Sequence, residues 1–161
     1  LAAYGEDRNG DGKVVVKVNV YTMDFGNEDS DAYLDMAGTT KLSTDIQGAL
    51  SSIFILYDPA GFQQTTGTLR YLDGSLPQSD ADSDWWNMVY RWTDCPVLTG
   101  LDLGNYDSDA VQNGSSQQLL SHYYIGIRGA WNKDSADLME GGEELWDALT
   151  AGAVSTVTEE G

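Results

Sequence analysis

Three oxygen-bearing side chains alternate near the start of the chain, at Asp7, Asn9 and Asp11, and a glycine follows at position 12. Oxygen ligands at every second position before a glycine form the first half of a calcium loop, since calcium prefers hard oxygen ligands on a tight turn. The second half is missing, because Val15 and Val18 occupy the later ligand positions. The stretch therefore predicts either an incomplete calcium site at Asp7, Asn9 and Asp11 or a polar turn whose side chains hydrogen-bond their own backbone.

A second group that could do chemistry is the aromatic cluster of Trp85, Trp86 and Trp92, with Arg91 and Asp94 beside it. Indole rings offer flat apolar faces and attract cations, and neighbouring charged groups can orient a ligand. We therefore predict that these five residues form a binding site for a sugar or a cationic solute. The alternative is that the indoles pack in the hydrophobic core, which is the commoner place for such residues.

The residue types needed for nucleophilic or zinc-dependent catalysis are scarce. His122 is the only histidine and Cys95 the only cysteine, whereas a zinc site needs several such ligands. No serine lies in a nucleophile-elbow pattern, and the sequence contains no glycine-rich phosphate loop. Cys95 is predicted to be a small buried hydrophobic residue. The sequence thus predicts no catalytic residue and no required cofactor.

The charge balance restricts the partners of the chain. Its 26 acidic and 8 basic residues give a formal net charge of −18, which repels phosphate backbones and anionic membrane surfaces and favours cations. We therefore expect no nucleic-acid partner. No apolar run approaches the ~20 residues of a membrane span, so we expect no transmembrane span in this chain.

The hydrophobic periodicity of the first third of the chain indicates an α/β arrangement. Valines alternate with polar residues over residues 14–23, which predicts a strand with one buried face. Apolar residues then recur at helical spacing over residues 31–50, and residues 53–57 are apolar on both faces, as in a central parallel strand. Strand, helix and strand in this order form a βαβ unit, so the two strands are predicted to be parallel neighbours.

The rest of the chain completes a single domain. Strands are predicted over residues 88–98, with a break at a proline, and over residues 119–128, and a final helix begins near residue 134. With 161 residues, of which 41% are hydrophobic, the chain can bury one core. We predict one α/β domain over residues 1–153, with a mixed or mostly parallel sheet and helices on its faces. A polar C-terminal tail over residues 154–161 is expected to fray.

Six segments spread along the chain follow the pattern of one protein family. They are residues 9–13, residues 36–42, residues 57–59 with Phe62, residues 71–74, residues 90–98 and residues 124–128. Together they resemble the exported lipoproteins of gut Firmicutes that are distantly similar to extracellular solute-binding proteins. The resemblance implies a lipid-anchored or secreted bacterial protein, with a fold like one lobe of a periplasmic-binding protein. It also implies a signal or lipobox segment upstream of residue 1.

Residues and resemblance together give an expected function. We expect a non-enzymatic, exported protein domain, outside the cell or at its surface, that binds a solute or a surface partner. One alternative is a structural or interaction module without a small ligand, in which the acidic surface only maintains solubility. The other is a secreted hydrolase that uses two carboxylates, because so many acidic residues are present.

Overall fold

The computed structural model describes residues 1–21, 32–78, 84–108 and 112–160, with only the backbone of residues 32–35. Its helices are α1 (Ala32–Gln47), α2 (Pro59–Thr66), α3 (Pro96–Thr99), α4 (Ser116–Leu120) and α5 (Lys133–Leu149). Its strands are β1 (Ile53–Leu56), β2 (Val89–Arg91), β3 (Asn105–Tyr106), β4 (Gly114–Ser115) and β5 (Tyr124–Ile127). Three short 3-10 helices are η1 (Ala2–Tyr4), η2 (Trp85–Asn87) and η3 (Trp92–Asp94).

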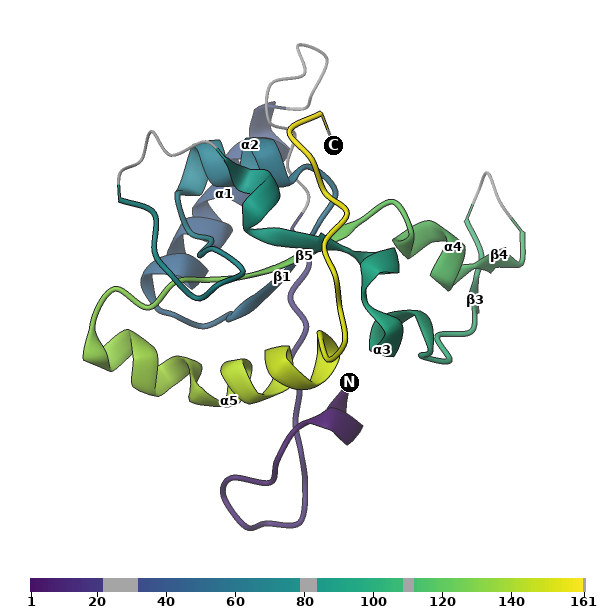
Figure 1. Ribbon diagram of the computed structural model, residues 1–161, viewed down its shortest axis with the longest axis horizontal. Helices are drawn as coiled ribbons and strands as arrows, with labels where there is room; N and C mark the ends of the chain where they lie inside the picture. Colours follow the sequence, from purple (N-terminus) through teal and green to yellow (C-terminus); the bar gives the residue numbers. More distant parts are fainter. Residues whose placement is uncertain (22–31, 79–83, 109–111, 161) are drawn as a thin grey trace.

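The centre of the fold is a three-stranded sheet in the order β1-β5-β2, with β5 antiparallel to both neighbours. Leu56 at the end of β1 and Arg91 at the end of β2 both lie opposite Tyr124, the first residue of β5. The ends of β1 and β2 and the start of β5 therefore meet at one edge of the sheet. A small antiparallel pair, β3 and β4, projects from the side of the domain (Figure 1).

The predicted parallel βαβ unit is wrong, although its helix is present as α1. Residues 14–21 belong to no strand, residues 22 and 23 lie outside the described residues, and β1 pairs antiparallel with β5. In the structure this run is buried only in part: Phe54 is buried, whereas Ile55 is 45% exposed and Tyr57 is 72% exposed. A run that is apolar on both faces predicts a central parallel strand, but β1 is an outer strand of an antiparallel sheet and is partly open to solvent.

Each face of the sheet carries its own hydrophobic core, so the fold is a single α/β domain with helices on both faces (Figure 1). On the face of α1 and α2 the buried residues are Leu42, Phe54, Phe62, Leu69, Met88 and Val89. On the face of α5 and α3 they are Trp92, Cys95, Leu98, Ile125, Ile127, Met139, Trp146 and Leu149. A Cβ at Gly126 would lie 3.0 Å from Leu69 and 3.1 Å from Val89, so glycine permits this close packing against β5.

Side-chain caps fix where the helices next to the sheet begin. Asp58 accepts a hydrogen bond from the Gly61 N–H at 2.9 Å and Pro59 follows, a combination that favours the start of α2. Asn132 accepts from the Ser135 N–H at 2.8 Å, and the Ser135 hydroxyl oxygen accepts from the Asn132 N–H at 3.2 Å. The final helix thus begins slightly before the predicted position, with Asn132 as its N-cap. Asp29 and Ser30, which could cap the start of α1 by residue type, lie outside the described residues.

Two buried charged residues, Arg128 and Asp45, lie where the N-terminal segment meets the domain. Arg128 is 0% exposed, donates to the carbonyl of Ile46 at 2.7 Å, and lies over the Trp131 ring at 4.4 Å. Burial lowers the pKa of Arg128, and the negative charge of Asp45 opposes this shift. Asp45 is itself buried and accepts hydrogen bonds from the Tyr21 and Ser51 hydroxyls. This carboxylate therefore holds the end of residues 14–21 against α1.

The polar C-terminal segment is attached to the sheet rather than frayed at residues 155–157. Both oxygens of Asp94 accept hydrogen bonds from Thr156, from its N–H at 3.0 Å and from its hydroxyl at 2.7 Å. Ser155 donates to the carbonyl of Val89 at 3.3 Å, and Val157 packs against the core on the α1 side. The segment rises from the end of α5 and crosses the sheet (Figure 1). Its polar residues therefore donate hydrogen bonds to β2, through Ser155, and to η3, through Thr156.

Candidate functional site

The structure distributes the five residues of the predicted binding site over separate environments. Trp92 is 3% exposed and its Nε1–H donates to Gln117 Oε1 at 2.8 Å, so it presents no ring face to solvent. Asp94 holds the C-terminal segment. Trp86 lines one surface hollow and Arg91 lines another. These residues are close in sequence but do not form a single binding site in the structure.

The hollow beside Trp86, here called the acidic hollow, has a volume of about 520 Å³. Its lining residues are Tyr71, Leu72, Asp73, Ser75, Asp84, Trp86, Asn87, Ser155 and Val157. They come from three segments that are far apart in the sequence: the turn at 71–75, η2 with Asp84 before it, and the attached C-terminal segment. In the sequence Asp80, Asp82 and Asp84 form an acidic run before Trp85. Asp84 lines this hollow, whereas Asp80 and Asp82 lie outside the described residues.

The turn at 71–75 holds Asp73 in place through its own hydrogen bonds. The Tyr71 N–H donates to the Ser75 carbonyl at 3.0 Å, and Gly74 has a φ of +88°, a conformation that glycine adopts without strain. Asp73 Oδ1 accepts from the Ser75 hydroxyl at 2.6 Å and from the Ser75 N–H at 2.8 Å. The hydroxyl bond, followed by the backbone bond, lowers the pKa of Asp73. This carboxylate is therefore ionised at neutral pH.

Asp84 is held by two hydrogen bonds, one from the turn and one from η2. The Tyr71 hydroxyl donates to Asp84 Oδ1 at 2.6 Å, and the Asn87 amide donates to Oδ2 at 3.2 Å. The bond from Tyr71 is the main reason that the pKa of Asp84 is lowered, and it outweighs the opposing effect of burial. A hydrogen bond from the Leu72 N–H to the Asn87 carbonyl, 2.9 Å long, joins the turn to η2.

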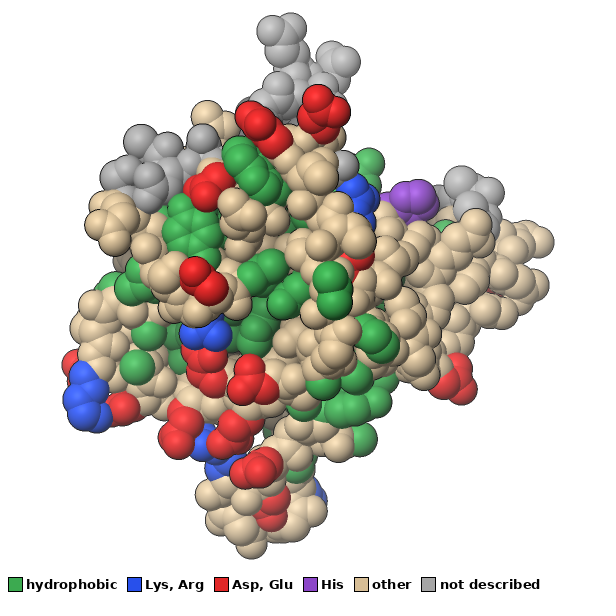
Figure 2. Space-filling model, in the orientation of Figure 1, with side chains coloured by type: hydrophobic (Ala, Val, Ile, Leu, Met, Phe, Trp, Pro, Cys, Tyr) green, Lys and Arg blue, Asp and Glu red, His purple; other side chains and the backbone are tan. Residues whose placement is uncertain are grey.

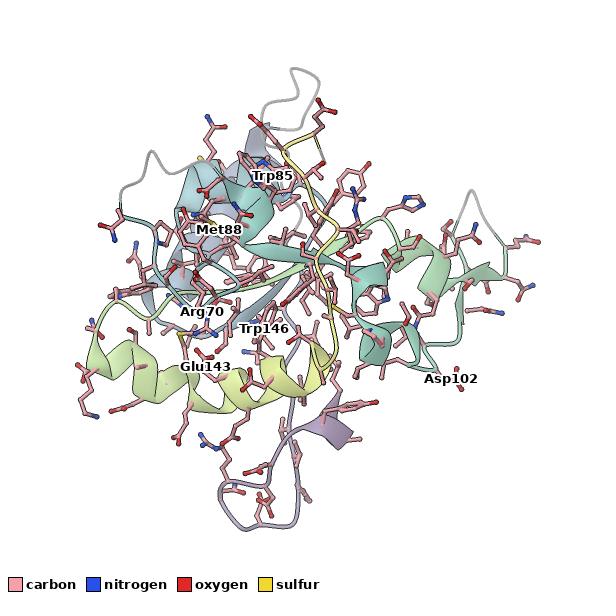
Figure 3. All side chains as sticks on the ribbon, viewed as in Figure 1. Arg70, Trp85, Met88, Asp102, Glu143 and Trp146 are labelled. Atoms are coloured by element: carbon pink, nitrogen blue, oxygen red, sulfur yellow. The ribbon has the colours of Figure 1, made fainter. Side chains whose placement is uncertain are left out.

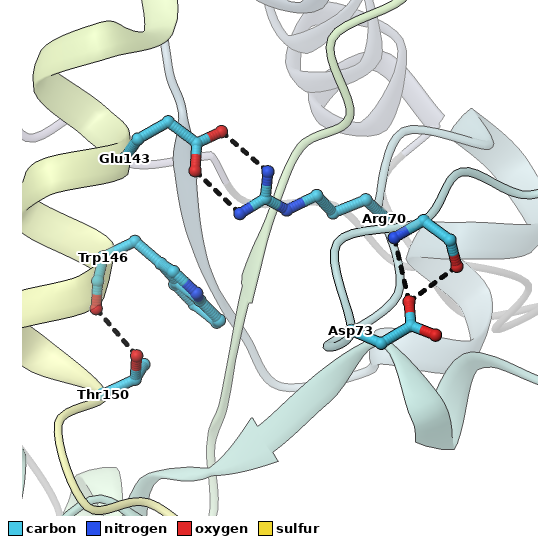
Figure 4. A network of polar contacts seen from close by, with 6 residues as sticks. Arg70, Asp73, Glu143, Trp146 and Thr150 are labelled. Atoms are coloured by element: carbon cyan, nitrogen blue, oxygen red, sulfur yellow. Dashed lines mark hydrogen bonds and ion pairs between the residues drawn. The ribbon is translucent and has the colours of Figure 1, made fainter.

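An ion pair anchors the turn to α5. Arg70 donates through both terminal nitrogens to Glu143, at 2.8 and 2.7 Å, and the two side chains face each other across the gap between the turn and the helix (Figures 3 and 4). A two-point contact between guanidinium and carboxylate fixes orientation as well as distance. Both side chains are partly buried, which limits screening by solvent. The position of Asp73 is thus set from the outside as well as by its own turn.

Aromatic rings form the apolar part of this region. Trp85 and Trp86 meet edge to face with centroids 6.2 Å apart, and Trp85 makes a similar contact with Tyr124 of β5 at 6.0 Å. Trp85 packs against the core on the α1 side, whereas Trp86 is half-buried and lines the hollow. Two ionised carboxylates beside an indole and a phenol suit a ligand with a cationic group and an apolar body. The lining residues within the described chain include no lysine, arginine or histidine.

The Asp7, Asn9 and Asp11 turn makes internal hydrogen bonds. Asp7 accepts from the Gly10 N–H at 2.9 Å and from the Gly12 N–H at 2.7 Å, and Asp11 accepts from the backbone N–H at position 13 at 2.9 Å. These are the bonds of a polar turn. In the described part of the chain, no three His, Cys, Asp or Glu side chains are grouped so that they could hold a metal ion. Calcium binding by this turn stays a prediction.

Cys95 and His122 lie in contrasting environments. Cys95 is 0% exposed, and burial, helped by the nearby charge of Asp94, raises the pKa of its thiol to about 12. A protonated, buried thiol is a poor nucleophile, in agreement with the predicted hydrophobic role. His122 is exposed and lines the hollow that contains Arg91.

Sequence reasoning missed most of the acidic hollow. The turn residues Tyr71, Asp73 and Ser75 were recognisable as a turn from the Asp73-Gly74 pair, but nothing local indicated that Asp84 would lie against them. The contribution of Ser155 depends on the attachment of the C-terminal segment, which is a tertiary contact.

Comparisons with known proteins return no match: no protein-family model, no curated protein and no solved structure is significantly similar to this chain. The class of protein is therefore defined by its fold and its surface, as a small α/β domain with an antiparallel sheet and an acidic, aromatic hollow. Among the described residues, no helix has the length and apolar character needed to cross a membrane.

Proposed function

We propose that this domain is a non-enzymatic binding protein that takes a small amine-bearing cation into the acidic hollow. The observation that carries the proposal is the pairing of Asp73 and Asp84, both with lowered pKa values, with the ring of Trp86 in one hollow. Its volume of about 520 Å³ suits a small molecule. The formal net charge of −18 adds a long-range attraction for cations.

The same geometry argues against a carboxylate-dependent hydrolase. Such an enzyme needs one carboxyl group with a raised pKa that can act as a general acid. In the acidic hollow both carboxylates have lowered pKa values, because Ser75 and Tyr71 donate hydrogen bonds to them. Two permanently ionised groups suit recognition of a cation better than proton transfer.

The proposal includes a location outside the cell or at its surface. Its support is the resemblance of six sequence segments to exported lipoproteins that are similar to solute-binding proteins. The antiparallel β1-β5-β2 sheet differs from the parallel sheet expected for one lobe of a periplasmic-binding fold. Binding is therefore proposed for a hollow on the surface of one domain and not for a cleft between two lobes.

The proposal is tested by calorimetric titration with ligands that share a ring and differ in charge. Benzylammonium should bind saturably, and the neutral benzyl alcohol should bind at least about tenfold more weakly, because a charge-assisted hydrogen bond to a carboxylate is lost. Asp84→Asn and Trp86→Ala should each weaken benzylammonium binding. Polyamines and oligosaccharides extend the panel to larger cations and to sugars.

Asp102→Asn is a charge-matched control, since Asp102 is exposed and lies far from Trp85 (Figure 3). It should leave benzylammonium binding unchanged. Equal affinity for benzylammonium and benzyl alcohol, or unchanged binding by Asp84→Asn, would contradict a cation site. Saturable binding of an oligosaccharide that Trp86→Ala removes would favour a sugar site instead. No binding by any member of the panel would favour the interaction module.

A further inference from the structure

We propose that the domain has a second binding site, for a carboxylate-bearing solute, at the sheet edge where β1 and β2 end and β5 begins. The site is a hollow of about 470 Å³, here called the arginine hollow. Its lining residues are Tyr57, Asp58, Arg91, Ser121, His122 and Tyr124. It shares none of its lining residues with the acidic hollow, so the proposal does not depend on the amine-binding function.

The strand register brings these side chains together. Arg91 and Tyr124 are directly opposite each other on neighbouring strands, so their side chains lie on the same face of the sheet. Tyr57 continues the chain beyond Leu56, which also lies opposite Tyr124. His122 lies two residues before the start of β5, at the same end of the sheet. Residues from separate parts of the sequence thus converge because the three strand ends meet.

Arg91 is the group that would bind the carboxylate. Its guanidinium lies over the Tyr124 ring, 5.3 Å from the centroid, and within the described residues no carboxylate lies within ion-pair distance of it. Arg8 and Arg70, in contrast, are paired with glutamates. A guanidinium without an ion pair can donate two parallel N–H bonds to one carboxylate.

The other lining groups fit an anion on a flat body. Tyr57 is 72% exposed and meets Tyr123 edge to face at 5.6 Å, so its ring and hydroxyl are open to a ligand. His122 is exposed and can donate a further hydrogen bond. The acidic residue of the lining, Asp58, already accepts a bond from the Gly61 N–H at the start of α2. Figure 2 shows the sole histidine beside a basic side chain at the surface.

The two hollows therefore differ in the charged groups that line them. The acidic hollow offers two carboxylates and is lined by no basic residue in the described chain, whereas the arginine hollow offers hydrogen-bond donors around an arginine without a carboxylate partner. Among the described residues, the Arg91 guanidinium forms no ion pair, although Asp58 also lines the hollow. A carboxylate ligand would supply the missing partner.

The experiment is a titration followed by two-dimensional NMR, with benzoate as the probe and neutral benzamide as its isostere. Benzoate should shift the signals of the Arg91 side chain, His122 and Tyr57 in a saturable way, and benzamide should bind at least about tenfold more weakly. Arg91→Gln should weaken benzoate binding to a similar extent. Tyr57→Ser, at an exposed position where folding is not at risk, should weaken it severalfold.

Arg8→Gln is the matched control, because it removes the same charge from an exposed arginine and should leave benzoate binding unchanged. Asp84→Asn should also leave it unchanged, which separates this site from the acidic hollow. Equal binding of benzoate and benzamide, unchanged binding by Arg91→Gln, or equal loss in Arg8→Gln would each overturn the proposal. Absence of saturable shifts at Arg91, Tyr57 and His122 would overturn it as well.

Discussion

The carboxylates of this acidic chain have different structural roles, and the role of each depends on the groups that donate hydrogen bonds to it. Asp45 is buried and holds the N-terminal segment through the Tyr21 and Ser51 hydroxyls. Asp94 uses both oxygens to hold the C-terminal segment. Asp84 is tied by a tyrosine hydroxyl and an amide but still lines a hollow. An aspartate can therefore be assigned a role only after its donors are known.

Cys95 provides a prediction about stability at high pH. Burial raises the pKa of its thiol to about 12, whereas a cysteine in an unfolded chain ionises near pH ~8.5. The unfolded chain therefore loses its thiol proton first. The contribution of the protonated Cys95 thiol to the free energy of unfolding is fully present below pH ~8.5. It falls as the pH rises toward 12, by at most about 1.4 kcal/mol per pH unit.

Urea unfolding of the natural chain and of Cys95→Ala, measured at intervals from neutral pH to pH ~11, separates this contribution. The alanine variant is expected to be less stable at neutral pH because it leaves a cavity, but its free energy of unfolding should fall less steeply. Tyr21, whose pKa is also raised to about 12 by burial and then by its bond to Asp45, contributes to the decline in both chains. Parallel declines in the two chains would contradict the assignment to Cys95.

At the level of elements, hydrophobic periodicity predicted the helices better than the pairing of strands. The helices over 31–50 and near residue 134 are present as α1 and α5, and the run at 53–57 contains β1. The strand predicted over 88–98 is only three residues long before η3 and α3 take over. Strand partners depend on contacts between segments far apart in sequence, and these leave no local periodic signal.

For the candidate site too, the sequence predicts local features but not the contacts between distant segments. Trp86 was predicted to bind a ligand and lines the acidic hollow, whereas Trp92, an identical residue six positions later, is in the core. The sequence could place both in an aromatic cluster but not distinguish them. What separates them is Gln117, which satisfies the Trp92 indole from another part of the chain.

The attached C-terminal segment provides a prediction at this scale. Thr156→Val removes the hydroxyl that donates to Asp94 while keeping the shape of the side chain, and should destabilise the domain by about 1 kcal/mol. Because Ser155 and Val157 line the acidic hollow, loosening the segment should also weaken benzylammonium binding.

Hydrogen–deuterium exchange is the direct measurement, and exchange at residues 154–158 should accelerate more than exchange in α5. Thr158→Val, at an exposed neighbouring threonine, is the control and should leave both exchange and binding unchanged. Asp94→Ala combined with Thr156→Val should cost less than the sum of the single changes, because both remove the same bond. Additive costs would show that Asp94 and Thr156 act independently.

At the scale of the whole molecule, acidic residues greatly outnumber basic residues. Acidic side chains are spread over the visible face, and basic side chains are few (Figure 2). Most described basic groups with an ion pair lie against α5, as Arg8 and Arg70 do. The remaining negative charge is not neutralised within the domain. The folded chain should therefore repel itself and attract cations from solution.

Self-repulsion predicts that added salt stabilises this domain. Raising sodium chloride from about 0.02 M to about 0.5 M shortens the screening length several-fold, so the melting temperature should rise. The Arg70–Glu143 pair is screened too, but it is one partly buried contact against a net charge of −18. Calcium and magnesium at matched ionic strength should raise the melting temperature equally, because the oxygens of Asp7 already accept backbone hydrogen bonds. A larger rise with calcium, abolished by Asp11→Ala, would instead assign an ion to the Asp7, Asn9 and Asp11 turn. A melting temperature that falls with sodium chloride would show that attractive ion pairs outweigh the repulsion.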